Sequence, residues 1–202
     1  MAHNLDDFIG NFDGGTRAHR YRITNGTIPN ADTGGPGAEL NQYHVRALEI
    51  PPSQVNPIRI PYRGRILKWA GDRLYFPWTI RILDEPGETD KIDTLWKAFH
   101  NWSNDINNHK SNIHTTPGGA DGFDSADWTF QQVDGDVGDD PAGEGSKLKE
   151  INLFGCWPTT IGPLGLDANS VDQLVEFTVT VEYQYYTVTV PGINDSEAAG
   201  NA

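Results

Sequence analysis

Few residues in this chain have the types and spacing that catalysis or metal binding requires. The single cysteine, Cys156, lies in an apolar stretch, which favours a buried, inert thiol over a nucleophile, and no Gly-x-Ser-x-Gly elbow is present. One cysteine also excludes an internal disulfide and a thiolate zinc cluster. The histidines show neither HExxH nor HxH spacing; they are His3, His19, His44, His100, His109 and His114. We therefore expect no enzymatic activity, no metal site and no cofactor.

The nearest approach to a metal-binding motif is an acidic stretch rich in glycine. Asp134, Asp136 and Asp140 alternate in part as in the first half of a calcium loop. That loop needs Gly at its sixth position, where the chain has Asp139, and Glu at its twelfth, where the chain has Gly145. A solvated acidic loop is the simpler interpretation. Paired carboxylates for glycoside hydrolysis have no spacing that would reveal them, and nothing in the chain favours them.

Composition predicts one globular domain. The chain has 202 residues, of which 37% are hydrophobic and 22 are Gly, enough to bury a core. Its 15 Lys and Arg against 28 Asp and Glu give a net charge of −13, which excludes a general phosphate-binding surface. No run approaches the length of a membrane span, and the first residues lack the basic and apolar regions of a secretory signal. We expect a reducing cytoplasm, or a particle assembled there.

Two segments carry opposite charge. Residues 57–81 contain one acid, Asp72, against six cations: Arg59, Arg63, Arg65, Lys68, Arg73 and Arg81. Residues 121–150 contain nine acids against Lys147 and Lys149. The two segments are either solvated loops or complementary surfaces for head-to-tail self-association, a contact that propagates.

Period-2 alternation between turn residues predicts a mainly β chain. The expected strands cover 16–24, 43–50, 58–62, 76–85, 128–133, 147–157 and 171–190. Residues 63–75 are expected to form a basic excursion with turns at Gly64 and Gly71, and 25–37, 108–126 and 134–146 to form loops. The domain is predicted to span 16–190, between a flexible N-terminal arm at 1–15 and a flexible C-terminal tail at 191–202.

Helical periodicity occurs once, over residues 90–107. An apolar stripe recurs at spacings of three and four; it consists of Ile92, Leu95, Trp96, Phe99, Trp102 and Ile106. The opposite, polar face carries Asp93, Lys97, Asn101 and Asn104. The sum is an antiparallel β-barrel or sandwich with one α-helix packed outside.

The final predicted strand, 171–190, has one apolar and one polar face. The apolar face runs through Val175, Phe177, Val179, Val181, Tyr183 and Tyr185. The polar face carries Glu176, Thr178, Thr180, Glu182, Gln184 and Tyr186. Such a strand needs a core on one side and water on the other.

Several phrases occur in an order that resembles the tail tube protein family of contractile-tailed, T-even-like bacteriophages. They are PYRGRILKWAGDR, PWTIRILDE, AFHNWSNDINNHKSN, LFGCWPTTIGPLGLD and VEFTVTVEYQYY. The most specific pieces are RGR…GDR, the final VEFTVTVEYQY, and the set Phe154, Gly155 and Pro158. The resemblance covers roughly 57–112 and 147–186, about half the chain. The Asp-rich arm and the loops at 25–37 and 134–146 depart from the family pattern.

The resemblance implies a structural virion protein of the tail. In that family six subunits join their sheets into a ring, and rings stack into a hollow tube inside a contractile sheath, through which double-stranded DNA passes without specific binding. Baseplate and tail terminator proteins would be the other partners, with no membrane. The polar strand face (Glu176, Thr178, Thr180, Glu182 and Gln184, joined by Glu150) would then line the lumen. Ring stacking or subunit contact would fall to Arg63, Arg65, Lys68 and Arg73, and sheath contact to Asp93, Lys97, Asn101 and Asn104.

Other assignments remain open at this point. Within the class, the chain could be the tube protein of a phage-derived injection particle, or a baseplate protein that starts the tube. Outside it, six Trp residues leave room for a carbohydrate-binding β-sandwich module. A lectin should stay monomeric or form small closed oligomers, whereas a tube protein should form rings or filaments.

Overall fold

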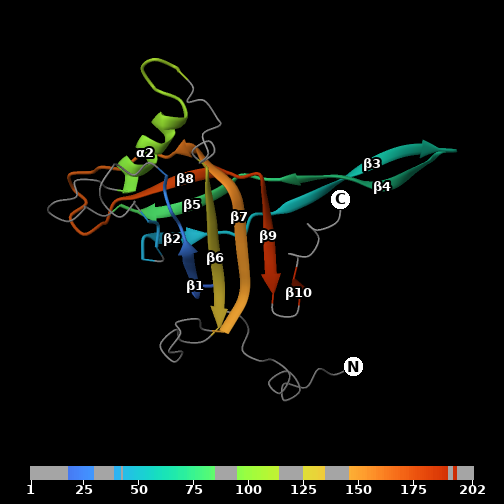
Figure 1. Cartoon of the computed structure of the whole chain (residues 1–202), viewed down its shortest axis with the longest axis horizontal. Helices are drawn as coiled ribbons and strands as arrows, with labels where there is room; N and C mark the ends of the chain where they lie inside the picture. The colour runs from blue at the N-terminus through green and yellow to red at the C-terminus, as the bar shows by residue number, and fades with distance from the viewer. Residues whose placement is uncertain are drawn as a thin grey trace.

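A computed structural model describes residues 18–29, 39–41, 43–84, 95–113, 125–134, 146–190 and 193–194. Within these ranges the chain forms ten strands and one helix (Figure 1). The first strands are β1 (Tyr21–Asn25), β2 (Val45–Leu48), β3 (Ser53–Tyr62), β4 (Arg65–Tyr75) and β5 (Trp78–Leu83). Then come α2 (Leu95–Ile106), β6 (Ala126–Asp134), β7 (Ser146–Ile161), β8 (Glu176–Glu182), β9 (Tyr185–Val190) and β10 (Ile193–Asn194). The predicted arm, most of the predicted tail and acidic loop, and Asp93 lie outside the described residues.

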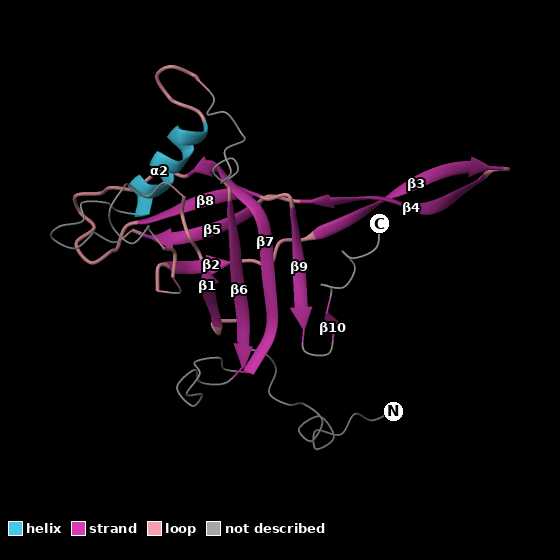
Figure 2. Cartoon of the chain, viewed as in Figure 1, coloured by secondary structure: helices cyan, strands magenta, loops and turns pink. Residues whose placement is uncertain are grey.

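All the strand ladders are antiparallel (Figure 2). The main sheet has the order β1-β6-β7-β8-β5-β2, with β9 on β7 and β10 on β9. Among the described residues, strands β3 and β4 pair only with each other. The prediction of a mainly β, antiparallel fold with one helix is therefore confirmed for the described part of the chain. No described ladder joins the end strands β1 and β2; Tyr21 Oη instead donates a hydrogen bond to the Val45 carbonyl at 2.6 Å. Closure into a barrel stays a prediction.

Strand β7 bends at a corner, and this corner divides the main sheet into two halves. One edge of β7 pairs with β6; the other pairs first with β9 and then with β8. At the corner Gly155 has a φ of 63°, a left-handed value that favours glycine. A Cβ at Gly155 would lie 2.9 Å from Cγ of Gln184, in the segment between β8 and β9. Figure 1 shows β6, β7 and β9 running across the direction of β8 and β5, so the halves fold around one core.

The faces predicted for the last strand are wrong beyond the corner. The predicted strand 171–190 begins at Glu176 and divides into β8 and β9. Tyr183 is buried as expected, but Tyr185 is 47% exposed, whereas Tyr186 packs against the core. Tyr183 and Gln184 lie between the two strands, and this break shifts the alternation, so that Tyr186 rather than Tyr185 faces the core.

The core lies between the two sheet halves and is covered by α2. Phe99 and Trp102 of the helix are fully buried, and their rings lie 6.3 and 5.9 Å from that of Trp128 on β6. Trp78 of β5 stacks on Phe130 of β6 with ring centroids 5.1 Å apart. The predicted apolar stripe therefore packs as expected from Leu95 onward, where the described helix begins.

The predicted basic excursion at 63–75 is wrong in its secondary structure. Residues 65–75 form strand β4, which pairs along its length with β3 in a two-stranded ribbon that projects from the body (Figure 1). The chain reverses through Arg63 and Gly64, both with positive φ, as two-residue hairpin turns require. The strand expected at 58–62 extends back to Ser53. Pro57 and Pro61 fit in β3 because no third described strand pairs with β3 and would need their missing N–H groups.

Burial raises the pKa of the Cys156 thiol from 9.0 to about 12, and the charge of nearby Asp127 adds to this effect. Between these pH values the unfolded chain releases a proton that the folded chain keeps. The thiol's contribution to stability is therefore complete below about pH 9 and declines as the pH rises towards 12. Between pH 8 and pH 10.5 we expect the wild type to lose about 2 kcal/mol more than Cys156→Ala. Urea unfolding at both pH values measures the difference, and equal losses would contradict it.

Candidate assembly surfaces

The first candidate surface is the polar face of β8. Phe177, Val179 and Val181 are buried, so the alternating residues between them lie on the side away from the core. These residues are Glu176, Thr178, Thr180 and Glu182, which are half-buried or exposed. The structure confirms that they share one face. Gln184 lies beyond the strand, at the corner, where its amide N–H bonds the Phe154 carbonyl at 2.9 Å.

The polar face of β8 also carries two arginines that the sequence did not reveal. Arg46 Nε lies 3.1 Å from a carboxylate oxygen of Glu176. Arg81 is opposite Thr178 in the β5–β8 ladder, so both side chains lie on one face. These arginines come from strands far away in the sequence, and only the β2–β5–β8 register brings them beside the two glutamates. The face is mixed in charge rather than uniformly acidic.

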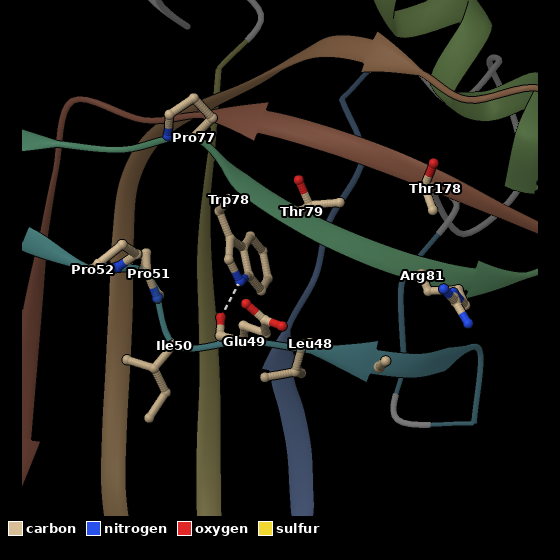
Figure 3. A pocket seen from close by; sticks show the side chains of 11 residues that line it. Leu48, Glu49, Ile50, Pro51, Pro52, Pro77, Trp78, Thr79, Arg81 and Thr178 are labelled. Atoms are coloured by element: carbon tan, nitrogen blue, oxygen red, sulfur yellow. Dashed lines mark hydrogen bonds between the residues drawn. The ribbon is translucent and has the colours of Figure 1, made fainter.

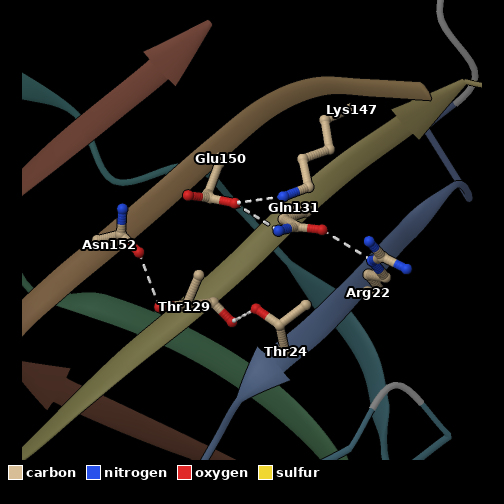
Figure 4. A network of polar contacts seen from close by, with 7 residues as sticks. All are labelled: Arg22, Thr24, Thr129, Gln131, Lys147, Glu150 and Asn152. Carbon is tan, nitrogen blue, oxygen red and sulfur yellow. Dashed lines mark hydrogen bonds and ion pairs between the residues drawn. The ribbon is translucent and has the colours of Figure 1, made fainter. Parts of the chain in front are cut away.

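Glu150 belongs to a different polar row, on the other half of the sheet. Its carboxylate accepts a hydrogen bond from Gln131 Nε2 at 2.5 Å and lies 3.5 Å from Lys147 Nζ (Figure 4). Arg22 Nε donates to Gln131 Oε1 at 2.7 Å, which completes a cross-strand network over β1, β6 and β7. Glu182 is opposite Trp157, seven residues further along β7, or roughly 23 Å of extended strand. The structure therefore does not bring Glu150 beside the β8 glutamates.

The helix and the polar face of β8 lie on opposite sides of that strand. The ring of Phe99 lies 6.2 Å from that of Phe177, and Phe177 points to the core side of β8. On α2, Lys97 is exposed, and Asn101 and Asn104 are half-buried. Asn104 Oδ1 accepts a hydrogen bond from the His109 amide at 3.1 Å, so it helps to shape the segment after the helix.

Two histidines lie close to these polar residues: His100 on the helix and His109 just after it. The ring of His100 lies 4.0 Å from that of Trp96 and 6.3 Å from that of His109. Burial, and then the charge of His109, lower the pKa of His100. No described group of three or more His, Cys, Asp or Glu could hold a metal ion.

The β3–β4 ribbon holds all four cations expected at subunit contacts. Arg63 is in the turn, with its guanidinium 5.5 Å from the Tyr62 ring centroid. Arg65 and Lys68 follow on β4, and Arg73, near the base, donates to Ser53 Oγ at 3.2 Å. The ribbon also exposes eight large apolar side chains, a signal that charge counting missed: Val55, Ile58, Ile60, Tyr62, Ile66, Leu67, Trp69 and Leu74.

A hollow of about 250 Å³ lies where β2 ends and β5 begins, beside the base of the ribbon (Figure 3). Leu48, Pro51, Trp78 and Arg81 are among its lining residues. Trp78 Nε1 donates a hydrogen bond across it to the Glu49 carbonyl at 2.5 Å. The lining has no arrangement of nucleophile and base.

None of the described helices is long and apolar enough to cross a membrane.

The fold occurs in contractile injection systems. A chain in the baseplate of the anti-feeding prophage superposes with a TM-score of 0.59 at 11% identity, covering 90% of this chain and 100% of that one. A chain in the extended sheath–tube complex of an extracellular contractile injection system, PVC, has a TM-score of 0.53 at 15% identity, covering 93% and 98%. These similarities define the fold.

In sequence, the chain is similar to tail tube proteins of phages. Tail tube protein gp19 of Enterobacteria phage T4 is 24% identical over 144 residues, which are 71% of this chain and 79% of the relative. The tail tube protein of Serratia phage KSP90 is 25% identical over 169 residues, 83% of this chain and 85% of the relative. No family model matches the chain. These homologues support a structural role in a phage tail tube and agree with the resemblance found in the sequence.

Proposed function

We propose that this protein is the structural subunit of a phage tail tube, assembled from stacked hexameric rings through which DNA is delivered. The observation that carries the proposal is its similarity to phage tail tube proteins over 71% to 83% of its length. The fold, shared with chains of contractile injection systems, supports it. The subunit needs no enzymatic activity and no cofactor for this role.

The radial orientation follows from the two sides of β8. The polar face, with Glu176, Thr178, Thr180 and Glu182, lines the lumen, and Gln184 extends it at the corner. The helix lies on the other side of the strand and faces the sheath through Lys97, Asn101 and Asn104. Asp93, which lies outside the described residues, belongs to the same sheath-facing proposal. Glu150 reaches the lumen only if the second half of the sheet also turns inward, because its network is separate from the β8 face.

The ribbon provides contacts between subunits or rings. Arg63, Arg65, Lys68 and Arg73 meet acidic groups of a neighbour there. An exposed ion pair contributes only about 0–1 kcal/mol, but sixfold symmetry repeats each pair around a ring. Sheath, baseplate and tail terminator proteins are the other proposed partners, since similar chains occur in complexes that include a sheath, a tube, a terminator and a baseplate. The mature location is the virion tail, after assembly in the host cytoplasm.

Negative-stain electron microscopy of the purified protein, with sedimentation at low and high salt, tests this function. We expect six-fold rings that stack into hollow tubes, because the ribbon and the edge strands need partners. A protein that stays monomeric at high concentration in both salts would overturn the proposal. If that monomer bound glycans, the carbohydrate-binding module would become the better assignment.

The similarity to chains of injection systems favours one further candidate, a tube protein or tube initiator of a phage-derived injection particle. The particle isolated from producing cells distinguishes it. A phage tail is attached to a capsid filled with DNA, whereas an injection particle has no capsid. A baseplate initiator would occur in one layer at the end of the tube.

A further inference from the structure

We propose that the β3–β4 ribbon of one subunit docks on residues 162–175, the connector between β7 and β8, of the next subunit. This inference rests on the proposed assembly and names the two surfaces that would meet. Both surfaces belong to the described residues, and both expose large apolar side chains. They carry opposite charge.

One face of the ribbon is apolar. In the ladder Ile58 is opposite Trp69, and Ile60 is opposite Leu67, so these four side chains lie together on one face. Trp69 is 66% exposed and Ile58 is 55% exposed. A two-stranded ribbon without a packed face is marginally stable in water, and apolar patches of this kind mark interaction sites. The ribbon therefore needs a partner that covers this face.

The other face and the tip of the ribbon are basic. Arg59 and Lys68 are opposite each other, a like-charge pair that is unfavourable without a counter-charge. Arg63 and Arg65 are at the tip. Within the described part of the chain, none of these four cations forms an ion pair. An acidic partner that covers the apolar face would give Arg63 and Arg65 at the tip a counter-charge.

The connector is apolar and acidic. Leu166, Val171 and Leu174 are 72% to 87% exposed, although they are large side chains that usually lie inside a fold. The only charged residues between positions 162 and 175 are Asp167 and Asp172.

Hydrogen bonds hold the connector in a defined conformation. Gly162 bonds the Thr178 carbonyl at 2.6 Å. Asp167 Oδ1 accepts a hydrogen bond from the Asn169 amide at 2.9 Å, as in an Asx turn. Its exposed apolar side chains are therefore presented by a shaped loop.

The two surfaces lie at opposite ends of the subunit. The ribbon projects at one end of the longest axis, and the connector, orange to red between β7 and β8, lies at the other end (Figure 1). Strand β5 separates them, because Leu83 at its end is opposite Glu176, the residue after the connector. Extended β4 and β5 together measure roughly 60 Å. A ribbon therefore cannot reach its own connector, and docking on another copy is a head-to-tail contact that propagates.

Charge favours the connector of a second copy over its ribbon as the partner of the ribbon. Pairing two ribbons through their apolar faces would leave Arg63 and Arg65 at both tips, and Arg59 and Lys68 on both outer faces, without counter-charges. Pairing two connectors would bring Asp167 and Asp172 of both copies together. Only the mixed contact places basic residues against acidic ones while apolar side chains cover each other.

A charge-swap experiment tests this contact. We expect Arg63→Glu/Arg65→Glu and, separately, Asp172→Lys to reduce tube yield at least tenfold, and the combination of all three changes to restore much of it. Asp167 is left intact because it holds the turn. Lys110→Glu, an exposed reversal after α2, is the control and should assemble normally. Electron microscopy and sedimentation give the yield, and circular dichroism confirms that each variant is folded.

The outcomes separate this inference from the proposed function. If the wild type forms tubes and the reversals do not impair them, or the combination fails to restore them, the ribbon–connector contact is wrong and the tube assignment stands. If the wild type forms no rings, the proposed function itself fails.

A second pair of variants removes apolar contacts without changing charge. Trp69→Ser and Leu174→Ser should each stay unassembled, because each lacks one of the two surfaces. Mixed at equal amounts they should form dimers that do not grow, since one intact ribbon can meet one intact connector. A mixture that remains monomeric would overturn the contact.

Discussion

Tubes built from the Glu176→Lys/Glu182→Lys variant are expected to assemble and then release DNA about tenfold more slowly at low salt. In the wild type the two glutamates share their face with Arg46 and Arg81, so that face has balanced charge. The double change leaves four cations per subunit there, repeated six times in each proposed ring. Phosphate contacts to Lys and Arg supply most non-specific DNA affinity, so a basic wall would hold the passing duplex.

The matched control for this experiment is Glu176→Gln/Glu182→Gln. It breaks the Arg46–Glu176 ion pair without adding positively charged side chains. Any slowing of DNA release that is caused by loss of that ion pair alone therefore appears in both variants. Ejection kinetics of reconstituted particles at about 50 mM and about 200 mM salt provide the measurement, because counterion release makes phosphate contacts weaken steeply over this range. Normal ejection by the lysine variant at low salt, or a subunit structure within the tube that places both residues outside, contradicts the lumen assignment.

Replacement of Trp128 by alanine is expected to cost about 3–5 kcal/mol of folding stability. Its ring lies 5.9 Å from those of Trp78 and Trp102, and its Nε1 donates to the Thr27 carbonyl at 2.9 Å. The substitution removes packing from both sheet halves and the helix, and it leaves that carbonyl without its donor. Since domains are stable by about 5–15 kcal/mol, this loss is a large fraction of the total folding stability, and the variant should unfold at a clearly lower urea concentration than the wild type.

Urea denaturation measures this loss, with two comparisons built into the chain. Trp128→Phe keeps most of the ring volume and should cost less than alanine. Trp69→Ala removes a tryptophan that is largely exposed on the ribbon, so the stability of the monomer should change by well under 1 kcal/mol. Equal losses for Trp69→Ala and Trp128→Ala would show that the aromatic cluster is not the centre of the core.

The sequence predicted the elements whose pattern is local. The helix stripe around Phe99 and Trp102 and the alternation of β8 around Val179 depend only on residues a few positions apart, and both are present. The ribbon was missed because its strands contain Gly71 and two prolines, which usually interrupt strands. They fit here because, in the part of the chain that the structure describes, β3 and β4 pair with no other strand.

The candidate surfaces were only partly predictable for a related reason. The residues of the polar β8 face share one strand, so the alternation found them. Arg46 and Arg81 join that face through the pairing of three strands, and Glu150 leaves it because β7 turns a corner at Gly155. Pairing register and a positive φ are long-range or conformational properties that one-dimensional charge patterns do not contain.

The passage of β7 through both sheet halves also determines how the subunit carries force. Hydrogen bonds in an antiparallel ladder run across the strands. Tension applied along β7 therefore loads its bonds to β6, β8 and β9 together, in shear, whereas a sideways pull on the ribbon would open the β3–β4 bonds one at a time. The subunit is mechanically strong along its shared strand and compliant at its projecting ribbon.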